Sequence, residues 1–496
     1  MQPFIINATQ HADQAAIVAD GQTYTYQQLL DASATMAGWL LDGRDDLAET
    51  CVAYMITPGF DYVRVQWGIW RAGGIAVPLA LSYPPPSLRY VLDDTEADIV
   101  VADAAYAGIL APLAAERGIR LLVLGQNEPT HSQPTLPALS PDRRAMILYT
   151  SGTTNLPKGV VTTHATIQAQ VSTLVSVWHW SADDHILCVL PLHHVHGIIN
   201  VVSCALWSGA TVEFMPNFSA EGVFNTFAQG AINVFMAVPT IYFKLIAYWE
   251  QLPADEQQAI SATLARFRLM VSGSAALPVT VMEKWQVISG HTLLERYGMT
   301  EIGMGISNPY EGERRVGAIG QPLPGVQVRL VNETDEPVPD GQPGEIQVKG
   351  PNVFLEYWQR PEATQKAFTA DGWFRTGDIA VNEDGYIRML GRDSIDIIKS
   401  GGYKISALEL EEVLRTHPAI SDCSVIGVPD DEWGEVVSAV LILKDTDVTP
   451  AGINSWLRER LPGYKIPRQY RIVAELPRNA MGKVTKNDLK PLFLTN

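Results

Sequence analysis

Residues Tyr149 to Gly159 read Tyr-Thr-Ser-Gly-Thr-Thr-Asn-Leu-Pro-Lys-Gly, and they directly follow the apolar run from Ala145 to Leu148. The pattern predicts a short buried strand that ends in a polar loop. In such a loop, glycine lets the backbone approach an anion, hydroxyl groups donate hydrogen bonds to it, and lysine adds positive charge. The predicted phosphate-binding residues are Thr150, Ser151, Gly152, Thr153, Thr154 and Lys158.

This loop differs from the Walker motif, because Pro157 stands five residues after Gly152, where that motif has glycine. Taken alone, the stretch would also fit an ordinary surface turn rich in serine, threonine and glycine. The motifs that follow it along the chain favour phosphate binding.

The composition indicates a multidomain enzyme. With 496 residues, of which 47% are hydrophobic, the chain can bury a large core in several folding units. The formal charge of -18 argues against general affinity for nucleic acid or for an anionic membrane. The four cysteines are widely spaced, which supports neither a disulfide framework nor a cysteine-based zinc site.

The location expected from the sequence is the cytoplasm. The first residues, Met1 to His11, carry neither a secretion signal nor a basic transit peptide. No segment reaches about 18 uninterrupted apolar residues, so no membrane span is expected.

Strands and helices alternate before the phosphate loop. Helical patterns at 61–71 and 87–93 separate apolar strands, which are predicted at 51–56, 75–79, 98–102 and 121–124. This alternation predicts a parallel sheet covered by helices on both faces. The polar stretch 126–142 is predicted to be an exposed connection.

Three histidines follow the strand predicted at 186–190. They are His193, His194 and His196, and a metal site is one interpretation of them. No cysteine, aspartate or glutamate lies within metal-ligand spacing, so the favoured interpretation is a pocket lining at the carboxyl end of a strand.

Two later stretches have the chemistry of a nucleotide site. Residues 269–278 form a strand that opens into small residues, including Ser272, Gly273 and Ser274, which would admit a flat ring. The second stretch runs from Glu295 to Glu301. It offers a stacking face, a hydroxyl and an oxygen ligand for magnesium on a phosphate, carried in turn by Tyr297, Thr300 and Glu301.

With these motifs in this order, the chain resembles the adenylate-forming superfamily of acyl-CoA synthetases, adenylation domains and luciferases. The resemblance covers nearly the whole length. It includes Gly344-Glu345-Ile346, Trp373 to Asp378, Gly391-Arg392, Lys399 to Ile405 and Pro477 to Lys483. The sequences of residues 194–197, 271–278 and 294–304 are similar to those of malonyl-CoA synthetases.

The resemblance implies an α/β fold with a large N-terminal body of several subdomains, whose parallel sheets are covered by helices. This body, residues 1–391, would bind ATP and the acyl substrate. Residues 392–496 would form a small, mobile α+β domain that carries the catalytic lysine and a CoA-facing loop. A hairpin turned at Asp384-Gly385 is predicted just before the boundary.

The resemblance also implies the roles of single residues. Lys483 matches the adenylation lysine, Asp378 would accept hydrogen bonds from the ribose, and Arg392 would contact ribose or phosphate. A turn cap or a surface salt bridge is the alternative for the last two. Catalysis is assigned to Lys483, Glu301 and Thr153, with Glu301 as the metal ligand. The nucleotide site would also include Gly298 and Met299, and the CoA-facing residues would be Ser400, Gly401 and Gly402.

The implied reaction uses ATP and CoA as co-substrates with Mg²⁺, and it joins a small carboxylate to the CoA thiol through an acyl-AMP intermediate. Malonate is the predicted acid. Met304 is expected to close a short pocket, and an arginine of the Arg314-Arg315 pair is expected to contact the second carboxylate. The full set of acyl-site candidates is His194, Lys244, Met304, Arg314 and Arg315. For the basic residues, a solvated surface position is the alternative.

Other functions remain open at this point. A fatty or aromatic acyl-CoA synthetase and a stand-alone adenylation enzyme that loads a carrier protein share the ATP motifs, while a degenerate nucleotide-binding protein is least favoured. Two departures from the superfamily pattern also stand out. Asn155 occupies a position that is usually glycine, and the hinge segment from Arg392 to Asp396 is one residue longer than in many relatives.

Overall fold

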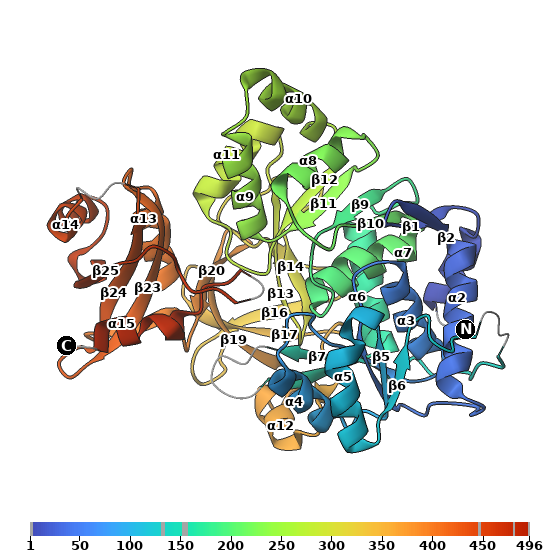
Figure 1. Cartoon of the computed structure of the whole chain (residues 1–496). Helices are drawn as coiled ribbons and strands as arrows, with labels where there is room; N and C mark the ends of the chain where they lie inside the picture. The colour runs from blue at the N-terminus through green and yellow to red at the C-terminus, as the bar shows by residue number, and fades with distance from the viewer. Residues whose placement is uncertain (1–2, 130–133, 151–156, 445–447, 480–481, 495–496) are drawn as a thin grey trace.

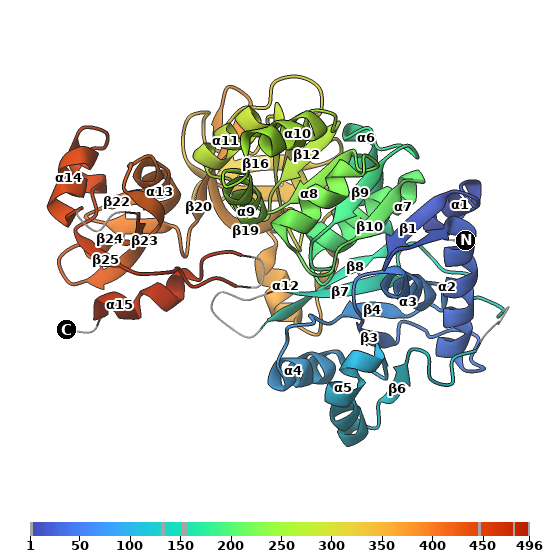
Figure 2. The same ribbon diagram turned by 45° about the horizontal axis from the view of Figure 1, so that its top comes forward.

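The computed structural model describes residues 3–129, 134–150, 157–444, 448–479 and 482–494. These residues form a large body, which contains the N-terminus, and a smaller C-terminal unit beside it (Figure 1). The same separation is visible after rotation of the view (Figure 2). The predicted α/β fold, with a large N-terminal body and a smaller C-terminal domain, is confirmed.

The first sheet of the body has the strand order β18-β8-β7-β4-β3-β5-β6. Its central strands are parallel, as the alternation of strands and helices predicts. The strands are β3 (Cys51–Met55), β4 (Ile75–Pro78), β5 (Ile99–Ala102), β6 (Arg120–Val123), β7 (Arg144–Thr150), β8 (Lys158–Thr163) and β18 (Glu356–Tyr357). The connecting helices are α3 (Phe60–Arg71), α4 (Pro85–Thr95) and α5 (Ala104–Arg117), and α12 (Pro361–Ala367) follows β18.

The second sheet has the order β15-β14-β13-β12-β11-β9-β10-β1-β2. Its strands are β1 (Ala15–Ala19), β2 (Gln22–Thr25), β9 (His185–Cys188), β10 (Thr211–Phe214), β11 (Val234–Ala237), β12 (Leu269–Ser272), β13 (Leu294–Met299), β14 (Gly303–Ser307) and β15 (Gln321–Pro322). Its helices are α1 (Pro3–Gln10), α2 (Tyr26–Leu41), α6 (His164–Val177), the π-helix η1 (His196–Ser203), α7 (Cys204–Ser208), α8 (Ala220–Ala228), α9 (Pro239–Trp249), α10 (Ala254–Leu264) and α11 (Val279–Ser289).

The body is layered. One continuous core joins the facing sides of the two sheets through apolar side chains of α2, α3 and α6. A second core, which includes Phe227, Tyr242 and Trp285, covers the outer face of the second sheet with α8 to α11. A third core covers the outer face of the first sheet with α4 and α5. In Figure 1 these two outer helix layers lie at the top and the bottom of the body. The layers bury the strands and leave polar residues to gather at the strand ends.

A third, antiparallel sheet belongs to the body and lies on its side toward the C-terminal unit (Figure 1). Its strands are β16 (Gln327–Val331), β17 (Gly344–Lys349), β19 (Phe374–Glu383) and β20 (Tyr386–Arg392). The predicted hairpin is present, because β19 and β20 pair around Asp384 and Gly385, which both have positive φ. Left-handed backbone at both central positions is the preferred geometry of a two-residue hairpin turn.

The C-terminal unit has its own sheet and its own core. The strands are β21 (Ile397–Ser400), β22 (Tyr403–Ser406), β23 (Ile420–Asp430), β24 (Gly434–Leu443) and β25 (Gln469–Ile472). Apolar side chains of helices α13 (Ala407–Arg415) and α14 (Pro450–Arg458) pack on this sheet. The single-turn helices η2 (Gly463–Lys465), η3 (Lys486–Leu489) and α15 (Pro491–Leu494) complete the unit. The boundary at residue 391 stays a prediction.

Gly159 lies inside β8 opposite Tyr149, where a Cβ atom would approach Ile147 Cγ2 to 2.7 Å, so its small size serves packing. Lys244 lies within helix α9. Among the residues described, no helix is long and apolar enough to cross a membrane.

Candidate active site

Asp378 lies where the second sheet, the third sheet and the start of the C-terminal unit meet. The Tyr297 hydroxyl donates to Asp378 Oδ2 at 2.6 Å, and Arg392 Nε lies 3.8 Å from Asp378 Oδ1. Arg392 Nη2 also donates to the carbonyl of Thr376 at 2.7 Å. Burial raises the pKa of Asp378, while the charge of Arg392 opposes this shift. The structure therefore brings together three residues that the sequence assigned to the nucleotide.

Glu301 follows β13 and is buried at 6% exposure. The hydroxyl of Tyr357, in β18, donates to Glu301 Oε1 at 2.9 Å. Lys158 Nζ lies 4.7 Å from the centroid of the Tyr357 ring. Tyr357 thus connects the predicted metal ligand with the predicted phosphate-binding lysine. Sequence reasoning missed it, because the pattern around Tyr357 shows only an aromatic residue near a turn.

The donor set around Glu301 fits magnesium bound to a polyphosphate. Magnesium is usually held by one or two carboxylates together with phosphate oxygens and waters, so a single buried carboxylate is sufficient. Burial raises the pKa of Glu301, and the Tyr357 hydroxyl opposes that shift. Across the ranges that the structure describes, no cluster of three or more His, Cys, Asp and Glu side chains could hold a metal by itself.

Lys483 belongs to the C-terminal unit, but its loop reaches the body. At the neighbouring Gly482, which has φ of 73°, a Cβ atom would lie 2.6 Å from Thr240 Oγ1 at the start of α9. Lys483 keeps contact with solvent, yet the surrounding protein lowers its pKa by burial, and the charge of Asp378 opposes this. Arg392 and Arg296 lower the Lys483 pKa further, so the lysine lies within electrostatic reach of all three side chains.

Arg296 lies at the same site, although the sequence motifs did not identify it. Its side chain, in β13, is 4% exposed and lies against Gly273, where a Cβ atom would approach Arg296 Cζ to 2.5 Å. Among the described residues, its Nε and Nη2 atoms have no hydrogen-bond partner. Burial lowers the pKa of Arg296 to about 9. The adjacent charged pair Glu295-Arg296 within a strand was the signal that could have identified it.

Two histidines lie within electrostatic reach of Lys483 and Arg296. His196 Nδ1 lies 3.0 Å from Ser274 Oγ, and His196 Nε2 has no partner among the described residues. Burial lowers the pKa of His194 to about 3, and the nearby charge of Lys483 contributes to the shift. Burial also lowers the pKa of His196, with a contribution from the charge of Arg296. Both rings are therefore neutral at physiological pH.

The other basic candidates for the acyl site lie elsewhere. Arg314 donates to the carbonyls of Thr292, Tyr310 and Pro309 at 2.8, 3.1 and 3.3 Å, so it braces a loop. Arg315 donates to the Glu383 carbonyl at 2.9 Å, and its guanidinium lies over a tyrosine ring.

Lys244 is exposed on α9, with its ammonium 5.7 Å from the Phe218 ring centroid. The structure does not bring Lys244, Arg314 or Arg315 to the cluster around Asp378. Met304 is buried in β14 opposite Gly298, and it stays a candidate for the end of the pocket.

The small residues of the predicted nucleotide site lie at the ends of β12 and β13. Ser272 is buried, and its hydroxyl has no partner in the described part of the chain. Ser274 has φ of 70°, which is an uncommon conformation for a residue other than glycine. Gly298, Met299 and Thr300 complete this edge. Thr150 ends β7. The predictions for Ser151, Gly152, Thr153, Thr154 and Asn155 lie outside the described residues.

The predicted CoA-facing residues form the turn between β21 and β22. Gly401 and Gly402 have φ of 56° and 81° and are exposed. Gly401 lies against the Trp433 ring, and Arg468 lies over the same ring at 3.6 Å from its centroid. Ser400 is buried at the end of β21. In this arrangement the turn contacts its own domain, whereas Lys483 reaches toward the body.

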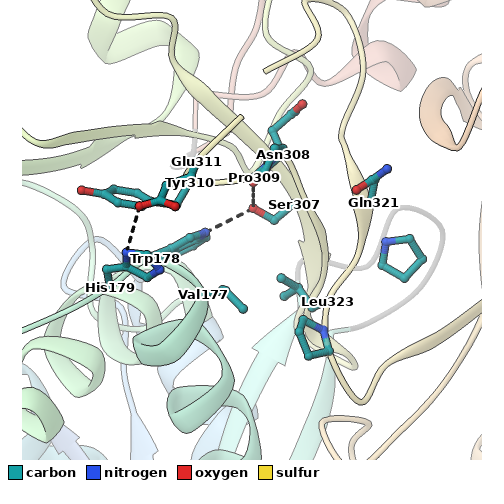
Figure 3. A pocket seen from close by; sticks show the side chains of 12 residues that line it. Val177, Trp178, His179, Ser307, Asn308, Pro309, Tyr310, Glu311, Gln321 and Leu323 are labelled. Carbon is teal, nitrogen blue, oxygen red and sulfur yellow. Dashed lines mark hydrogen bonds and ion pairs between the residues drawn. The ribbon is translucent and has the colours of Figure 1, made fainter. Parts of the chain in front are cut away.

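A separate pocket of about 310 Å³ lies between the end of α6 and the segment after β14 (Figure 3). Trp178 Nε1 donates to Ser307 Oγ at 3.2 Å, and His179 Nδ1 lies 3.8 Å from Glu311 (Figure 3). None of the residues that line this pocket belongs to the predicted ATP, acyl or CoA sets. The pocket is therefore separate from the candidate ATP, acyl and CoA sites.

The fold, a layered α/β body with a lysine of the C-terminal unit within electrostatic reach of Asp378, defines an adenylate-forming enzyme. The sequence model of the AMP-binding enzyme family matches residues 4–358, and that of the AMP-binding enzyme C-terminal domain matches residues 409–483. The chain belongs to the AMP-binding enzyme family.

Within this family, the chain is similar along nearly its whole length to malonate–CoA ligases. The chain is 44% identical to the mitochondrial malonate–CoA ligase ACSF3 of Xenopus laevis, across 98% of this chain and 91% of the relative. It is 34% identical to ATP-bound MatB from Rhodopseudomonas palustris, with a TM-score of 0.91 and coverage of 99% of both chains. A malonyl-CoA ligase in a ternary product complex with methylmalonyl-CoA and AMP is also 34% identical, with a TM-score of 0.71 and coverage of 96% of this chain and 100% of that chain.

Proposed function

We propose that this protein is an ATP-dependent malonate–CoA ligase. The observation that carries the proposal is Arg296, a buried guanidinium with two nitrogen atoms that have no partner among the described residues, near Lys483. A buried unpaired charge is costly, and a second carboxylate on the substrate would neutralise it. The similarity to malonate–CoA ligases along nearly the whole chain supports the same substrate.

In the first half-reaction, a carboxylate oxygen of the acid attacks the α-phosphorus of ATP, and the bond to the bridging oxygen breaks to release pyrophosphate. Lys483 is proposed to stabilise the negative charge that develops between the carboxylate and the α-phosphate. Lys158 and the hydroxyls of residues 150–154 would hold the polyphosphate, and Asp378 would orient the ribose. Magnesium, when held by Glu301, would offset the charge of the leaving pyrophosphate.

In the second half-reaction, the CoA thiol attacks the acyl carbon and AMP leaves. We propose that the C-terminal domain first rotates, withdraws Lys483 and presents Gly401 and Gly402 to the pantetheine arm. The superpositions support an adenylate-forming arrangement here, because at equal identity the TM-score is 0.91 with the ATP-bound relative and 0.71 with the product complex. One active site would thus serve both half-reactions, with Lys483 facing it in the first and Gly401 and Gly402 facing it in the second.

Substrate selection is assigned to Arg296, with His194 and His196 beside it and Met304 limiting the length of the acid. Arg296 takes the role that the sequence analysis gave to the Arg314-Arg315 pair, because those guanidinium groups already bind backbone carbonyls. A long fatty acid or benzoate would leave the Arg296 charge without a counter-ion. Malonate should therefore be preferred over acetate, octanoate and benzoate, and methylmalonate is expected to be accepted.

A panel of these acids with ATP, Mg²⁺ and CoA tests the proposal. Malonate should give the largest yield of acyl-CoA and of AMP. Preference for octanoate or benzoate would reject the dicarboxylate assignment and favour the fatty or aromatic alternative. Pyrophosphate exchange without consumption of free CoA would favour a carrier protein as acceptor, and absence of exchange with every acid would indicate a degenerate nucleotide-binding protein. A cytoplasmic location remains a prediction.

A further inference from the structure

Glu412 joins the C-terminal unit to the nucleotide side of the body. It lies on α13, and its Oε2 atom accepts a hydrogen bond from the backbone N–H of Val279 at 3.0 Å. Val279 is the first residue of α11, which has 11 residues. The first N–H groups of a helix lack partners within the helix and favour a negative charge. The body therefore provides a backbone donor that a carboxylate of the other domain satisfies.

The contact lies at the end of the predicted nucleotide loop. Residues 273–278 follow β12 and lead directly into α11. From inside the body, Glu295 Oε1 accepts a hydrogen bond from the backbone N–H of Leu277 at 3.3 Å. From the C-terminal unit, Glu412 holds the N–H two residues further along. The end of the loop is therefore held by one carboxyl group from each domain.

Glu412 is itself fixed in place. Arg415, three residues later on α13, donates to Glu412 Oε1 at 3.1 Å and leaves Oε2 for Val279. Burial raises the pKa of Glu412, and Arg415 opposes this shift. Another contact of the C-terminal unit with the body, between Lys404 and Glu333, is made by side chains that are 57% and 86% exposed, compared with 33% for Glu412. Exposed pairs contribute little, so Glu412 is the better candidate to hold the arrangement.

We propose that Glu412 is a positioning residue for the first half-reaction, because its contact with Val279 holds the C-terminal domain where Lys483 reaches the cleft. This inference rests on the proposed two-step function. Rotation of the domain would separate Glu412 from Val279, so the contact would favour adenylate formation and have no part in thioester formation.

The test measures the two half-reactions separately in the full-length enzyme. For Glu412→Ala, malonate-dependent pyrophosphate exchange should fall by about tenfold, as expected for loss of a hydrogen bond to a charged group. Glu412→Gln keeps a neutral acceptor for the Val279 N–H, so its exchange should fall by less. Thioester formation from supplied malonyl-AMP and CoA should stay at the wild-type rate. Glu409→Gln is the matched control, because Glu409 lies on the same helix but pairs with Lys465 of its own domain. Both of its half-reactions should be unchanged.

The donor can be removed independently by Val279→Pro. Proline is well tolerated at the first position of a helix, and Pro278 already has φ of -58° and ψ of 133°, a conformation allowed before proline. This variant should lose pyrophosphate exchange to the same extent as Glu412→Ala. The double variant should be no worse than either single one, since both changes remove the same contact.

Three results would overturn the inference. These are normal exchange in Glu412→Ala, an equal fall of both half-reactions, and additive losses in the double variant. Thermal unfolding of each variant identifies a general loss of folding, which would lower both half-reactions and so count against a positioning role. Should the wild-type enzyme use another acid in place of malonate, the malonate proposal fails, and the Glu412 comparison is made with that acid.

Discussion

The two functional segments of the C-terminal domain differ in what they touch. The segment around Lys483 is packed against the body, where Gly482 meets Thr240 and Lys483 lies within the field of Asp378. The turn at Gly401 and Gly402 is exposed, and Gly401 lies against the Trp433 ring of its own domain. Under the proposed function, this contrast predicts that a single arrangement serves one half-reaction, and that the domain moves before the other segment acts.

The site residues of the body are held by contacts that do not involve the C-terminal domain. Tyr297 holds Asp378, and Tyr357 holds Glu301, through contacts made within residues 1–391. These groups can keep their positions while the C-terminal domain changes its orientation. We therefore expect substitutions in the body to affect both half-reactions or substrate choice, and substitutions in the two C-terminal segments to separate the half-reactions.

The largest effect is expected from Lys483→Ala. Loss of one preorganised charge should slow adenylate formation by about 100-fold to 1000-fold, while thioester formation from supplied acyl-AMP is largely spared. Pyrophosphate exchange and single-turnover thioester formation measure the two steps. Equal damage to both would remove the distinction between the two C-terminal segments.

Arg296→Ala should come next. A hydrogen bond to a charged group contributes about 1.5 to 3 kcal/mol, so malonate turnover should fall by about tenfold to a hundredfold and the preference over acetate should disappear. Arg315→Ala is the control, because its guanidinium binds a backbone carbonyl outside the cluster and should leave the preference intact. Normal selectivity in Arg296→Ala would place the second carboxylate elsewhere.

Tyr357→Phe should have a smaller effect, confined to the nucleotide and its metal. The variant loses the 2.9 Å hydrogen bond to Glu301 but keeps the ring beneath Lys158. We expect the Mg²⁺ concentration for half-maximal pyrophosphate exchange to rise by about tenfold. The affinity for ATP measured by calorimetry without Mg²⁺ should not change. A fall in that metal-free affinity would mean that the hydroxyl acts beyond Glu301.

The smallest expected effect concerns pH. Burial lowers the pKa of Lys483 below the ordinary lysine value of about 10.4. Because the charged form is proposed to act, adenylate formation should decline on the alkaline side at a lower pH than an exposed lysine would allow. Lys483→Arg, if active, should move that decline to higher pH. An unchanged alkaline limb in this variant would assign the decline to another group.

Sequence reasoning located the residues whose place follows from strand ends and ordered motifs. Asp378, Arg392, Glu301 and Lys483 lie near one another, as the ordered motifs led us to expect. The antiparallel pairing of β19 with β20 sets Asp378 opposite Arg392, and the C-terminal loop brings Lys483 within reach of both. Sequence reasoning could not determine the direction in which a side chain points. Arg314 was assigned to the pocket, although its charge gives no information on which way its side chain points.

The residues that were missed act through neighbours distant in sequence. Tyr357 and Glu301 are 56 residues apart, and Glu412 and Val279 are 133 residues apart. No local pattern of hydrophobicity or charge encodes such pairs, because each member has an ordinary local role in a strand or a helix. Arg296 is the exception, since charged residues inside a predicted buried strand, here Glu295 and Arg296, already indicate a buried partner or a ligand.

The most direct test of domain alternation is a reversible crosslink between Thr240 and Gly482. A Cβ atom at Gly482 would lie 3.3 Å from Thr240 Cβ, close to the usual Cβ separation in a disulfide, and the natural cysteines are all buried. The oxidised Thr240→Cys, Gly482→Cys double variant should still form acyl-AMP but should produce acyl-CoA only after reduction. Acyl-CoA formation at the same rate before and after reduction would contradict the account.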